Sequence, residues 1–393
     1  MRVVQAVFGV FHHFELAHQL HRRNYLVKIY STWPWARLKR EGIPRNLVGT
    51  FPLVHTTHHL LGHSRLYPRA LSIKMMQWAP ATFDSWTKRV IAPCDAFIAI
   101  SGAGLATGQL VQSRGGKFIC DRGSTHQRHQ EQVVAEEYRR WQVPFLGEPP
   151  HILRREEQIY DAADAITVAS TAASRSFVAM GVPETKLHRI PYGVRLDKFA
   201  RTCPPPQDSF EVLFAGQVGL RKGIPYLLQA FARLKHPRKR LTVVGGMPNE
   251  MRALLAKLPT DQVTFTGSIP QTELAQKMSA SHVLVLPSVE DGFGLVMNQA
   301  MACGCPVIAT NATGAEDLFT DGREGFIVQP RDVDALVLRL QQLADDPGLQ
   351  QCMSEAALGR VRTLGGWDDY GQRWDDLLHT LTGLPQDGNP RSA

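Results

Sequence analysis

Short apolar runs rich in β-branched residues recur through the second half of the chain and alternate with segments of helical periodicity. The clearest amphipathic segment spans residues 224–234 and has Pro225 in its first turn, where proline is tolerated. The expected strands cover residues 211–215, 241–244, 263–266, 282–287 and 306–309, and the expected helices cover 224–234, 250–257, 272–279, 295–303 and 333–343. This alternation predicts a parallel, doubly wound sheet, which binds ligands at the carboxyl ends of its strands.

The first half of the chain shows a similar but weaker pattern. Its expected strands cover residues 3–8, 25–30, 96–100, 117–120 and 165–169, and its expected helices cover 14–22, 127–141, 152–162 and 171–180. The proline-rich run 202–209 disfavours helix and central strand and indicates a linker. We therefore predict a Rossmann-like N-terminal domain over 1–200 and a Rossmann-like C-terminal domain over 201–366. An amphipathic helix at about 367–385 follows, with packing back on the first domain as one option, and the tail 386–393 is expected to be disordered.

Length and composition exclude several classes of protein. The 393 residues, with 44% hydrophobic and 20% charged side chains, are ordinary for a two-domain globular protein. No run of about 18 apolar residues is present, so no membrane-spanning helix is expected. The N-terminal segment has the wrong shape for a signal peptide, and six cysteines in so long a chain do not form a disulfide scaffold. We expect a cytoplasmic protein with reduced thiols.

The formal net charge is +8, and much of the basic character lies early, at residues 21–23, 35–40 and Arg45. A solvated basic face is one interpretation. A surface for anionic lipid headgroups is the other, with Trp33 and Trp35 as interfacial anchors and the protein peripheral at the inner face of the membrane. No nucleic-acid-binding module is recognisable, so we expect no nucleic-acid partner.

The segment 290–310, EDGFGLVMNQAMACGCPVIAT, joins an acidic, Gly-containing turn to a helix. Gly292 and Gly294 let the backbone approach a ligand closely, and the helix presents free N–H groups and its positive dipole end there. Gln299 lies about 7–8 Å along that helix, a reasonable span from a diphosphate to a ribose. A tight strand–helix turn without any ligand is the alternative.

A second Gly-containing turn, residues 214–223, follows the first strand of the second domain. Its Arg221 and Lys222 bring two cations to the carboxyl edge of the sheet, where the turn at Asp291 is also expected. The segment matches a dinucleotide fingerprint poorly and contains no Walker-type lysine. An exposed basic turn is the alternative, but cations beside the acidic turn favour an anion site.

We expect no metal site. A histidine cluster is formed by His55, His58, His59 and His63. It has no interleaved carboxylate or cysteine, and Cys303 and Cys305 lack a second ligand pair with zinc spacing. The charged side chains of residues 136–140 are expected to form an exposed helix face.

Together, the two turns resemble those of the retaining glycosyltransferases of family 4, which have the GT-B fold. The resemblance covers most of the chain. Further similar stretches are DAITVAS at 164–170, GVP at 181–183, IPYGV at 190–194, VTFTG at 263–267, LPS at 286–288 and the segment 314–326. The resemblance implies an α/β protein with two Rossmann-like, doubly wound domains that face each other across a cleft. The C-terminal domain is then expected to hold a nucleotide sugar and the N-terminal domain most of the acceptor.

The resemblance also implies roles for the acidic turn. Asp291 takes the position that touches the donor sugar, and Gln299 takes the position of an acid that hydrogen-bonds the ribose. The amide at Gln299 is a departure, because it accepts through its carbonyl without charge. The residues of this turn and helix that are expected to bind the donor are Glu290, Gly292, Phe293, Gly294, Leu295 and Gln299.

The basic turn matches the family less closely. Lys222 corresponds to the lysine that contacts the diphosphate, whereas Gln217, next to Gly216, stands where arginine is usual, and Arg221 is expected to supply the missing charge. Gly9 lies where the family brings a loop near the donor phosphate. The family needs no metal, because the cations and a helix N-terminus neutralise the leaving diphosphate.

Family members often place a histidine against the sugar after another strand of the first domain. His126 is the candidate for that role, and it completes the expected catalytic set with Asp291, Lys222 and Arg221. Alternatively, His126 is only a neighbour of the helix cap. In that case His12 or His13 on the first loop contacts the sugar.

The expected activity is that of a hexosyltransferase without cofactor or metal. A sugar moves from a UDP- or GDP-sugar to a hydroxyl of a glycan, lipid-linked or small-molecule acceptor, with retention of configuration. A GT-B sugar-nucleotide epimerase is an alternative, although no acid/base pair is evident apart from Glu290 and Asp291. A non-catalytic nucleotide-sugar-binding protein is another, which Gln217 and Gln299 allow.

Overall fold

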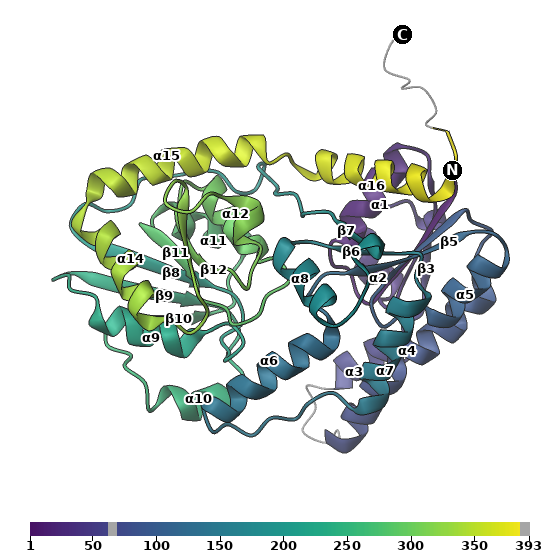
Figure 1. The fold of residues 1–393 in the computed structure, drawn as a ribbon, viewed down its shortest axis with the longest axis horizontal. Coiled ribbons are helices and arrows are strands. Elements are labelled where there is room, and N and C mark those ends of the chain that lie inside the picture. Colours follow the sequence, from purple (N-terminus) through teal and green to yellow (C-terminus); the bar gives the residue numbers. More distant parts are fainter. Residues whose placement is uncertain (62–68, 386–393) are drawn as a thin grey trace, which may run out of the picture.

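The computed structural model describes residues 1–61 and 69–385, and the predicted disordered tail 386–393 and His63 lie outside them. The described chain forms two α/β domains that lie side by side, each built on a parallel sheet (Figure 1). Strands in the middle of both sheets are buried along their whole length, as expected when helices cover both faces. This is the doubly wound architecture that the alternating pattern predicts.

The N-terminal sheet has the order β3-β2-β1-β4-β5-β6-β7. Its strands are β1 (Val3–Val7), β2 (Leu26–Ser31), β3 (Val48–Thr50), β4 (Ala96–Ile100), β5 (Lys117–Arg122), β6 (Ala165–Val168) and β7 (Leu187–Arg189). Its α-helices are α1 (His13–Arg22), α2 (Trp35–Leu38), α3 (His55–Leu61), α4 (Arg69–Val90), α5 (Leu105–Ser113), α6 (Gln127–Arg140), α7 (Pro150–Ala162) and α8 (Thr171–Ala179). Three 3₁₀ turns are η1 (Lys39–Glu41), η2 (Arg45–Leu47) and η3 (Glu184–Lys186).

The C-terminal sheet has the order β10-β9-β8-β11-β12-β13. Its strands are β8 (Phe210–Ala215), β9 (Lys239–Val244), β10 (Val263–Gly267), β11 (Val283–Leu286), β12 (Val307–Thr310) and β13 (Gly325–Val328). Its helices are α9 (Ile224–Arg233), α10 (Asn249–Leu255), α11 (Gln271–Ser279), α12 (Leu295–Ala302), α13 (Ala315–Leu318), α14 (Val333–Asp345) and α15 (Pro347–Thr363). The strand order reverses between β8 and β11, which are hydrogen-bonded neighbours.

Several elements are not evident from the sequence pattern. The short strands β3, β7 and β13, with three or four residues each, were not predicted. Helix α5 contains Gly108, which weakens its helical signal. A Cβ at Gly108 would lie 2.4 Å from the ring of Phe118 on β5, so the glycine is required by close packing of helix on sheet.

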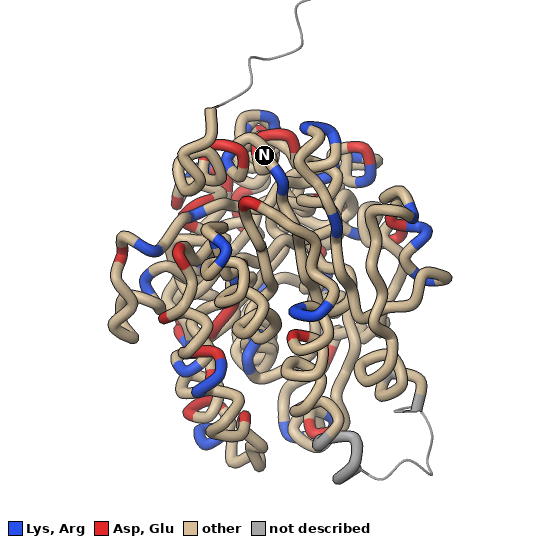
Figure 2. The backbone as a smooth tube through the Cα atoms, turned by 90° about the vertical axis from the view of Figure 1, so that its right-hand side faces the viewer, with Lys and Arg blue, Asp and Glu red and all other residues tan. Residues whose placement is uncertain are grey.

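The last helix, α16 (Trp367–Thr382), returns to the N-terminal domain and lies against α1 (Figure 1). Asp368 accepts hydrogen bonds from Gln19 at 2.9 Å and from Arg22 at 2.7 Å. Early basic charge is therefore partly paired with acids from the end of the chain. The tube view of this side likewise shows Lys and Arg interspersed with Asp and Glu (Figure 2). Among the described helices, none has the length and apolar character that crossing a bilayer requires.

Candidate active site

The two turns singled out in the sequence meet at the point where the C-terminal sheet reverses its strand order. The basic turn follows β8 and the acidic turn follows β11, and these two strands pair directly. Loops at such a switch point diverge above the carboxyl ends of the strands and leave a crevice for a ligand. The topology therefore brings together residues that lie about 70 positions apart, as the paired side chains below show.

The glycines of the two turns permit close backbone contacts. Gly223 precedes α9 with φ of +71°, and a Cβ there would lie 1.9 Å from the carbonyl oxygen of Pro287. At Gly292, a Cβ would lie 2.3 Å from the carbonyl oxygen of Gly123 in the N-terminal domain. Ser170 of that domain also donates to the carbonyl oxygen of Gly292 at 2.6 Å. Gly292 is thus a contact between the domains, a role that the sequence did not indicate.

Two ion pairs join the turns. Lys222 Nζ contacts Asp291 Oδ2, and Arg221 Nη1 lies 2.9 Å from Glu290 Oε2. Asp291 is also held by its backbone N–H, which donates to the carbonyl oxygen of Ala312 at 3.0 Å. Each cation therefore faces one carboxylate at the mouth of the switch point.

The electrostatics keep both acids ionised. Burial raises the pKa of Asp291, but the positive charges of Lys222 and Arg221 outweigh it and hold that pKa below its usual range. Burial likewise raises the pKa of Glu290, and the charge of Arg221 with hydrogen bonds from Thr125 and Arg221 lowers it overall. At neutral pH the site thus carries two fixed cations matched by two fixed anions.

Glu290 binds the N-terminal domain as well as Arg221. Its Oε1 accepts from Ser124 at 3.1 Å and from Thr125 at 2.7 Å, and its Oε2 accepts from Gln130 at 2.9 Å. The side chain is 2% exposed. Its oxygens are fully engaged by protein donors, so the structure assigns Glu290 an interdomain contact in place of the predicted contact with the donor.

The remaining residues of the predicted donor site lie around the same crevice. Gly294 has φ of +80° and precedes α12, whose first N–H groups are capped by no side chain of the described chain. Phe293 is buried against Tyr192, whereas Leu295 and Gln299 are half-buried at the start and on the body of α12. Free N–H groups at a helix start suit an anion.

The predicted residues Gly216 and Gly9 each lie in a loop at the carboxyl end of a strand. Gly216 follows β8, and its carbonyl oxygen would lie 1.7 Å from a Cβ at Gly245. Gln217, which stands where the family has arginine, is exposed. Gly9 follows β1 with φ of +72°, and its N–H donates to Thr32 Oγ1 at 3.0 Å.

The predicted catalytic histidine, His126, is turned into the N-terminal domain. Its Nδ1 accepts from the N–H of Arg128 at 3.2 Å and so caps α6. Its ring packs against Tyr160 and Phe177, with centroids 4.9 and 5.1 Å apart, and the residue is 3% exposed. The helix-cap interpretation therefore fits this geometry better than a contact with sugar.

Replacing His126 with asparagine is expected to flatten the acid dependence of stability. Burial lowers the pKa of His126 to about 4, whereas a histidine in an unfolded chain titrates near 6.5. Unfolded chains therefore gain the proton first as pH falls, and stability is full above about pH 6.5 and lost progressively towards pH 4. Asparagine keeps a cap acceptor and removes the titration, so urea unfolding should show about 2 kcal/mol less loss between pH 7 and 4.

The control for that measurement is His151→Asn, at an exposed histidine on α7, whose pH profile should match the unmodified protein. Identical profiles for His126→Asn and the unmodified protein would contradict the buried, neutral imidazole. If His126→Asn lowers the rate of sugar transfer a hundredfold, His126 takes part in the reaction.

Further contacts between the domains come from residues to which the sequence assigned no part in joining the domains. Asp317 accepts from the N–H and the hydroxyl of Thr171, each at 2.7 Å, and lies 2.9 Å from Arg189. Glu137 on α6 is fully buried and accepts from Tyr226 on α9 at 2.5 Å and from Arg331 at 2.7 Å. The expectation of an exposed charged face over residues 136–140 is thus wrong for Glu137, because the second domain covers it.

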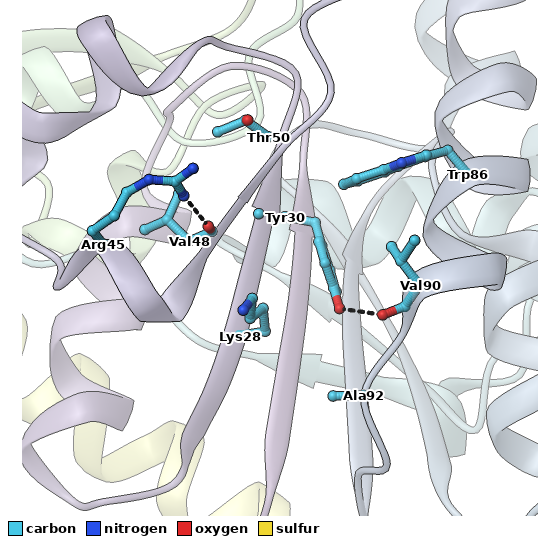
Figure 3. Close-up of a pocket in the computed structure, with 9 residues that line it drawn as sticks. Lys28, Tyr30, Arg45, Val48, Thr50, Trp86, Val90 and Ala92 are labelled. Atoms are coloured by element: carbon cyan, nitrogen blue, oxygen red, sulfur yellow. Dashed lines mark hydrogen bonds between the residues drawn. The ribbon is translucent and has the colours of Figure 1, made fainter.

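Two hollows within the described part of the chain are candidate ligand sites. One, of about 460 Å³, lies between the domains beside Glu290 and is lined by His129 and Arg175 on one side and Asn311 on the other. Another, of about 480 Å³, lies on the N-terminal domain near the edge strand β3 (Figure 3). Its polar side chains already have backbone partners, since Lys28 donates to Asn46 and Tyr30 to Val90. The first hollow is therefore the better match for a ligand at the crevice.

Comparison with known proteins bears on the second domain directly. Residues 197–360 match the family model described as Glycosyl transferases group 1. These residues form a group 1 glycosyltransferase domain. The domain contains both turns of the crevice, so Lys222, Arg221 and Asp291 are residues of a glycosyltransferase domain.

Curated proteins that are similar to this domain are also glycosyltransferases. The chain is 31% identical over 260 residues to a D-inositol 3-phosphate glycosyltransferase of Kribbella flavida, which covers 60% of this chain and 61% of that protein. It is 35% identical over 254 residues to one of Streptomyces avermitilis, covering 58% of this chain and 54% of that protein. The chain thus spans just over half to about three fifths of the length of these relatives.

Solved structures extend the likeness in fold to both domains. Sucrose-phosphate synthase from Thermosynechococcus elongatus superposes with a TM-score of 0.74 at 22% identity, covering 98% of this chain and 100% of that chain. Anabaena HepE in complex with UDP-glucose superposes with a TM-score of 0.67 at 17% identity, covering 96% and 99%. The fold is GT-B, with a group 1 glycosyltransferase domain facing a second Rossmann-like domain.

Proposed function

We propose that this protein is a glycosyltransferase that moves a sugar from a nucleoside diphosphate to an acceptor hydroxyl with retention of configuration. The observation that carries the proposal is the contact of Lys222 and Arg221 with the acidic turn at the switch point of a group 1 glycosyltransferase domain. Two cations beside a helix N-terminus form a site for a diphosphate.

Donor binding then works as an exchange of ion partners. Asp291 contacts Lys222, and a diphosphate brings enough negative charge to compete with that carboxylate for the cation. Asp291 is released next to the sugar, where an ionised carboxylate accepts hydrogen bonds from hydroxyl groups. Glu290 keeps Arg221 and the N-terminal domain in place meanwhile.

The same cations assist departure of the diphosphate. Negative charge grows on the leaving oxygen as the sugar–oxygen bond breaks, and Lys222, Arg221 and the N-terminus of α12 stabilise it electrostatically. The diphosphate therefore needs no metal ion of its own. We propose front-face displacement, in which the acceptor hydroxyl attacks on the side from which the diphosphate leaves, because no protein nucleophile is evident beside Asp291 among the residues that the structure describes.

The donor's ribose and the acceptor complete the proposal. Gln299 lies on α12 beyond the diphosphate site and binds a ribose hydroxyl through its amide. The acceptor, a glycan, a lipid-linked sugar or a small molecule, enters the hollow between His129 and Asn311. Contact with an anionic membrane is supported by two cation–π pairs, Arg37 over Trp33 at 4.5 Å and Arg45 over Trp35 at 5.1 Å.

Nucleotide binding and turnover test the proposal together. UDP, GDP, ADP and their sugars are screened by thermal shift, and one base should stabilise the protein by about 2.7 kcal/mol at one hundred times its dissociation constant. The matching donor should be consumed when an acceptor is added, with the anomeric configuration read by NMR. Gln299→Ala should weaken nucleotide binding about tenfold, and Gln276→Ala, at an exposed glutamine of α11, should leave it unchanged.

Each other result separates the alternatives. Binding without turnover of any donor indicates a nucleotide-sugar-binding protein, and conversion of the donor to an isomer without acceptor indicates an epimerase. If no nucleotide shifts the melting temperature even at millimolar concentration, the proposal of a donor site is wrong.

A further inference from the structure

Three buried or nearly buried side chains at the carboxyl edge of the N-terminal sheet converge on one point. His12 and His13 are consecutive at the start of α1, and Asp121 is the last residue but one of β5. His12 Nε2 lies 2.8 Å and His13 Nε2 lies 3.2 Å from the same atom, Asp121 Oδ2. Each residue offers one ligand atom, and these atoms lie within 4.8 Å of one another.

A hydrogen-bonded pair accounts for only part of this arrangement. His12 and Asp121 form one such bond, but neither ring nitrogen of His13 has a hydrogen-bond partner among the described residues. His13 is fully buried, and its Nε2 is aimed at the carboxylate. An unpaired buried polar group costs about 1–3 kcal/mol, so a histidine held in this way calls for a ligand.

The two separations from Asp121 Oδ2 are compatible with donor atoms that share a metal ion. A ligand atom lies about 2.1 Å from a first-row divalent metal, so atoms 2.8 and 3.2 Å apart subtend angles of about 85° and 100° at it. The carboxylate is oriented from behind, because Thr167 donates to Asp121 Oδ1 at 2.9 Å. Such outer hydrogen bonds are usual for metal-binding carboxylates.

We propose that His12, His13 and Asp121 bind a divalent transition-metal ion. Two imidazoles and one carboxylate suit Zn²⁺, Co²⁺ or Fe²⁺ and disfavour Mg²⁺ and Ca²⁺, which prefer oxygen ligands. Three protein ligands leave at least one coordination position open. The Tyr192 hydroxyl, 3.4 Å from His12 Nε2, also lies beside the cluster.

The position of the cluster suggests what the ion does. A Cβ at Gly123 would lie 2.8 Å from the Tyr192 hydroxyl and 3.3 Å from the His12 ring, and Gly123 itself contacts Gly292. The ion therefore fixes the N-terminal loop that meets the acidic turn. It belongs to the N-terminal domain, whereas the cations proposed for the diphosphate belong to the other, so the inference does not rest on the proposed function.

Metal analysis of the whole chain, purified without a histidine tag, tests the site. Protein treated with chelator is reloaded with Zn²⁺ alone, desalted and analysed by mass spectrometry, and about one ion per chain should remain. Zn²⁺ should also raise the melting temperature, and Co²⁺ should give visible ligand-field absorption. Asp121→Asn and His13→Asn should each weaken Zn²⁺ binding at least tenfold.

The control is His151→Ala, which removes an exposed histidine on α7 and should bind Zn²⁺ like the unmodified protein. Circular dichroism establishes whether each variant is folded. If one of them is unfolded, it is replaced by His12→Asn, because His12 is the most exposed of the three residues. The proposal is overturned if the unmodified protein retains no Zn²⁺ and shows no shift, which leaves a His12–Asp121 hydrogen bond only. Retention that is equal in all variants overturns it too, because the ion then binds elsewhere.

Discussion

Lys222→Ala is expected to lower kcat for sugar transfer by two to three orders of magnitude. Lys222 is the cation in contact with Asp291 at the N-terminal end of α9, and its side chain is only 14% exposed. Charge on a departing diphosphate develops mainly in the transition state, so a cation placed there in advance acts on kcat more than on ground-state binding. Removal of one such group costs about 2.7–4 kcal/mol in comparable sites.

The measurement is steady-state transfer with the donor identified by thermal shift. Lys235→Ala is the matched control, because this exposed lysine lies two residues beyond the C-terminal end of the same helix and should keep full activity. Lys222→Arg retains a cation and should recover part of the rate, which separates charge from packing. If Lys222→Ala keeps more than a third of the normal kcat, Lys222 takes no part in the reaction.

Glu137→Gln is expected to destabilise the protein by about 3–4 kcal/mol and to loosen the contact between the domains. Glu137 reaches from α6 into the C-terminal domain and accepts from Tyr226, Arg331 and Trp141. An amide is neutral and also brings N–H donors against Arg331, a half-buried cation that then keeps only its more exposed pair with Glu136. Figure 1 shows α6 running across towards α9 and α10, where this contact lies.

Urea unfolding monitored by two spectroscopic probes measures the loss, because separate transitions would show that the domains have uncoupled. Small-angle scattering should show a larger radius of gyration for Glu137→Gln. Glu136→Gln is the control: that side chain is 49% exposed, lies 3.4 Å from Arg331 and should change stability by less than about 1 kcal/mol. Equal effects of the two variants would contradict a special role for the buried carboxylate.

The reaction centre illustrates how far local patterns reach. Asp291 and Lys222 were identifiable because each belongs to a glycine-containing turn after an apolar strand. In a parallel sheet such turns lie together at the carboxyl edge, independent of the rest of the chain. Glu290 was taken as a donor ligand, whereas the structure engages it with Thr125 and Gln130. Its neighbours in sequence say nothing of those partners.

The histidines also show that local sequence patterns do not reveal the tertiary partners of a residue. His126 follows a strand, as a catalytic residue would, yet its ring packs into the core against Tyr160. His12 and His13 were only alternatives on the first loop, because their partner Asp121 lies more than a hundred positions away. Proximity of this kind depends on β1 and β5 facing the same edge of one sheet.

The sequence by itself determined the alternation of strands and helices, the two-domain division and the two charged turns, because these depend on periodicity and glycine placement within short segments. Only the tertiary structure decided that Glu137 is buried, that Glu290 joins the domains and that three side chains converge at Asp121. The physical reason is that burial and ion pairing are set by what packs against a residue, and here the packing partner comes from a distant strand or from the other domain.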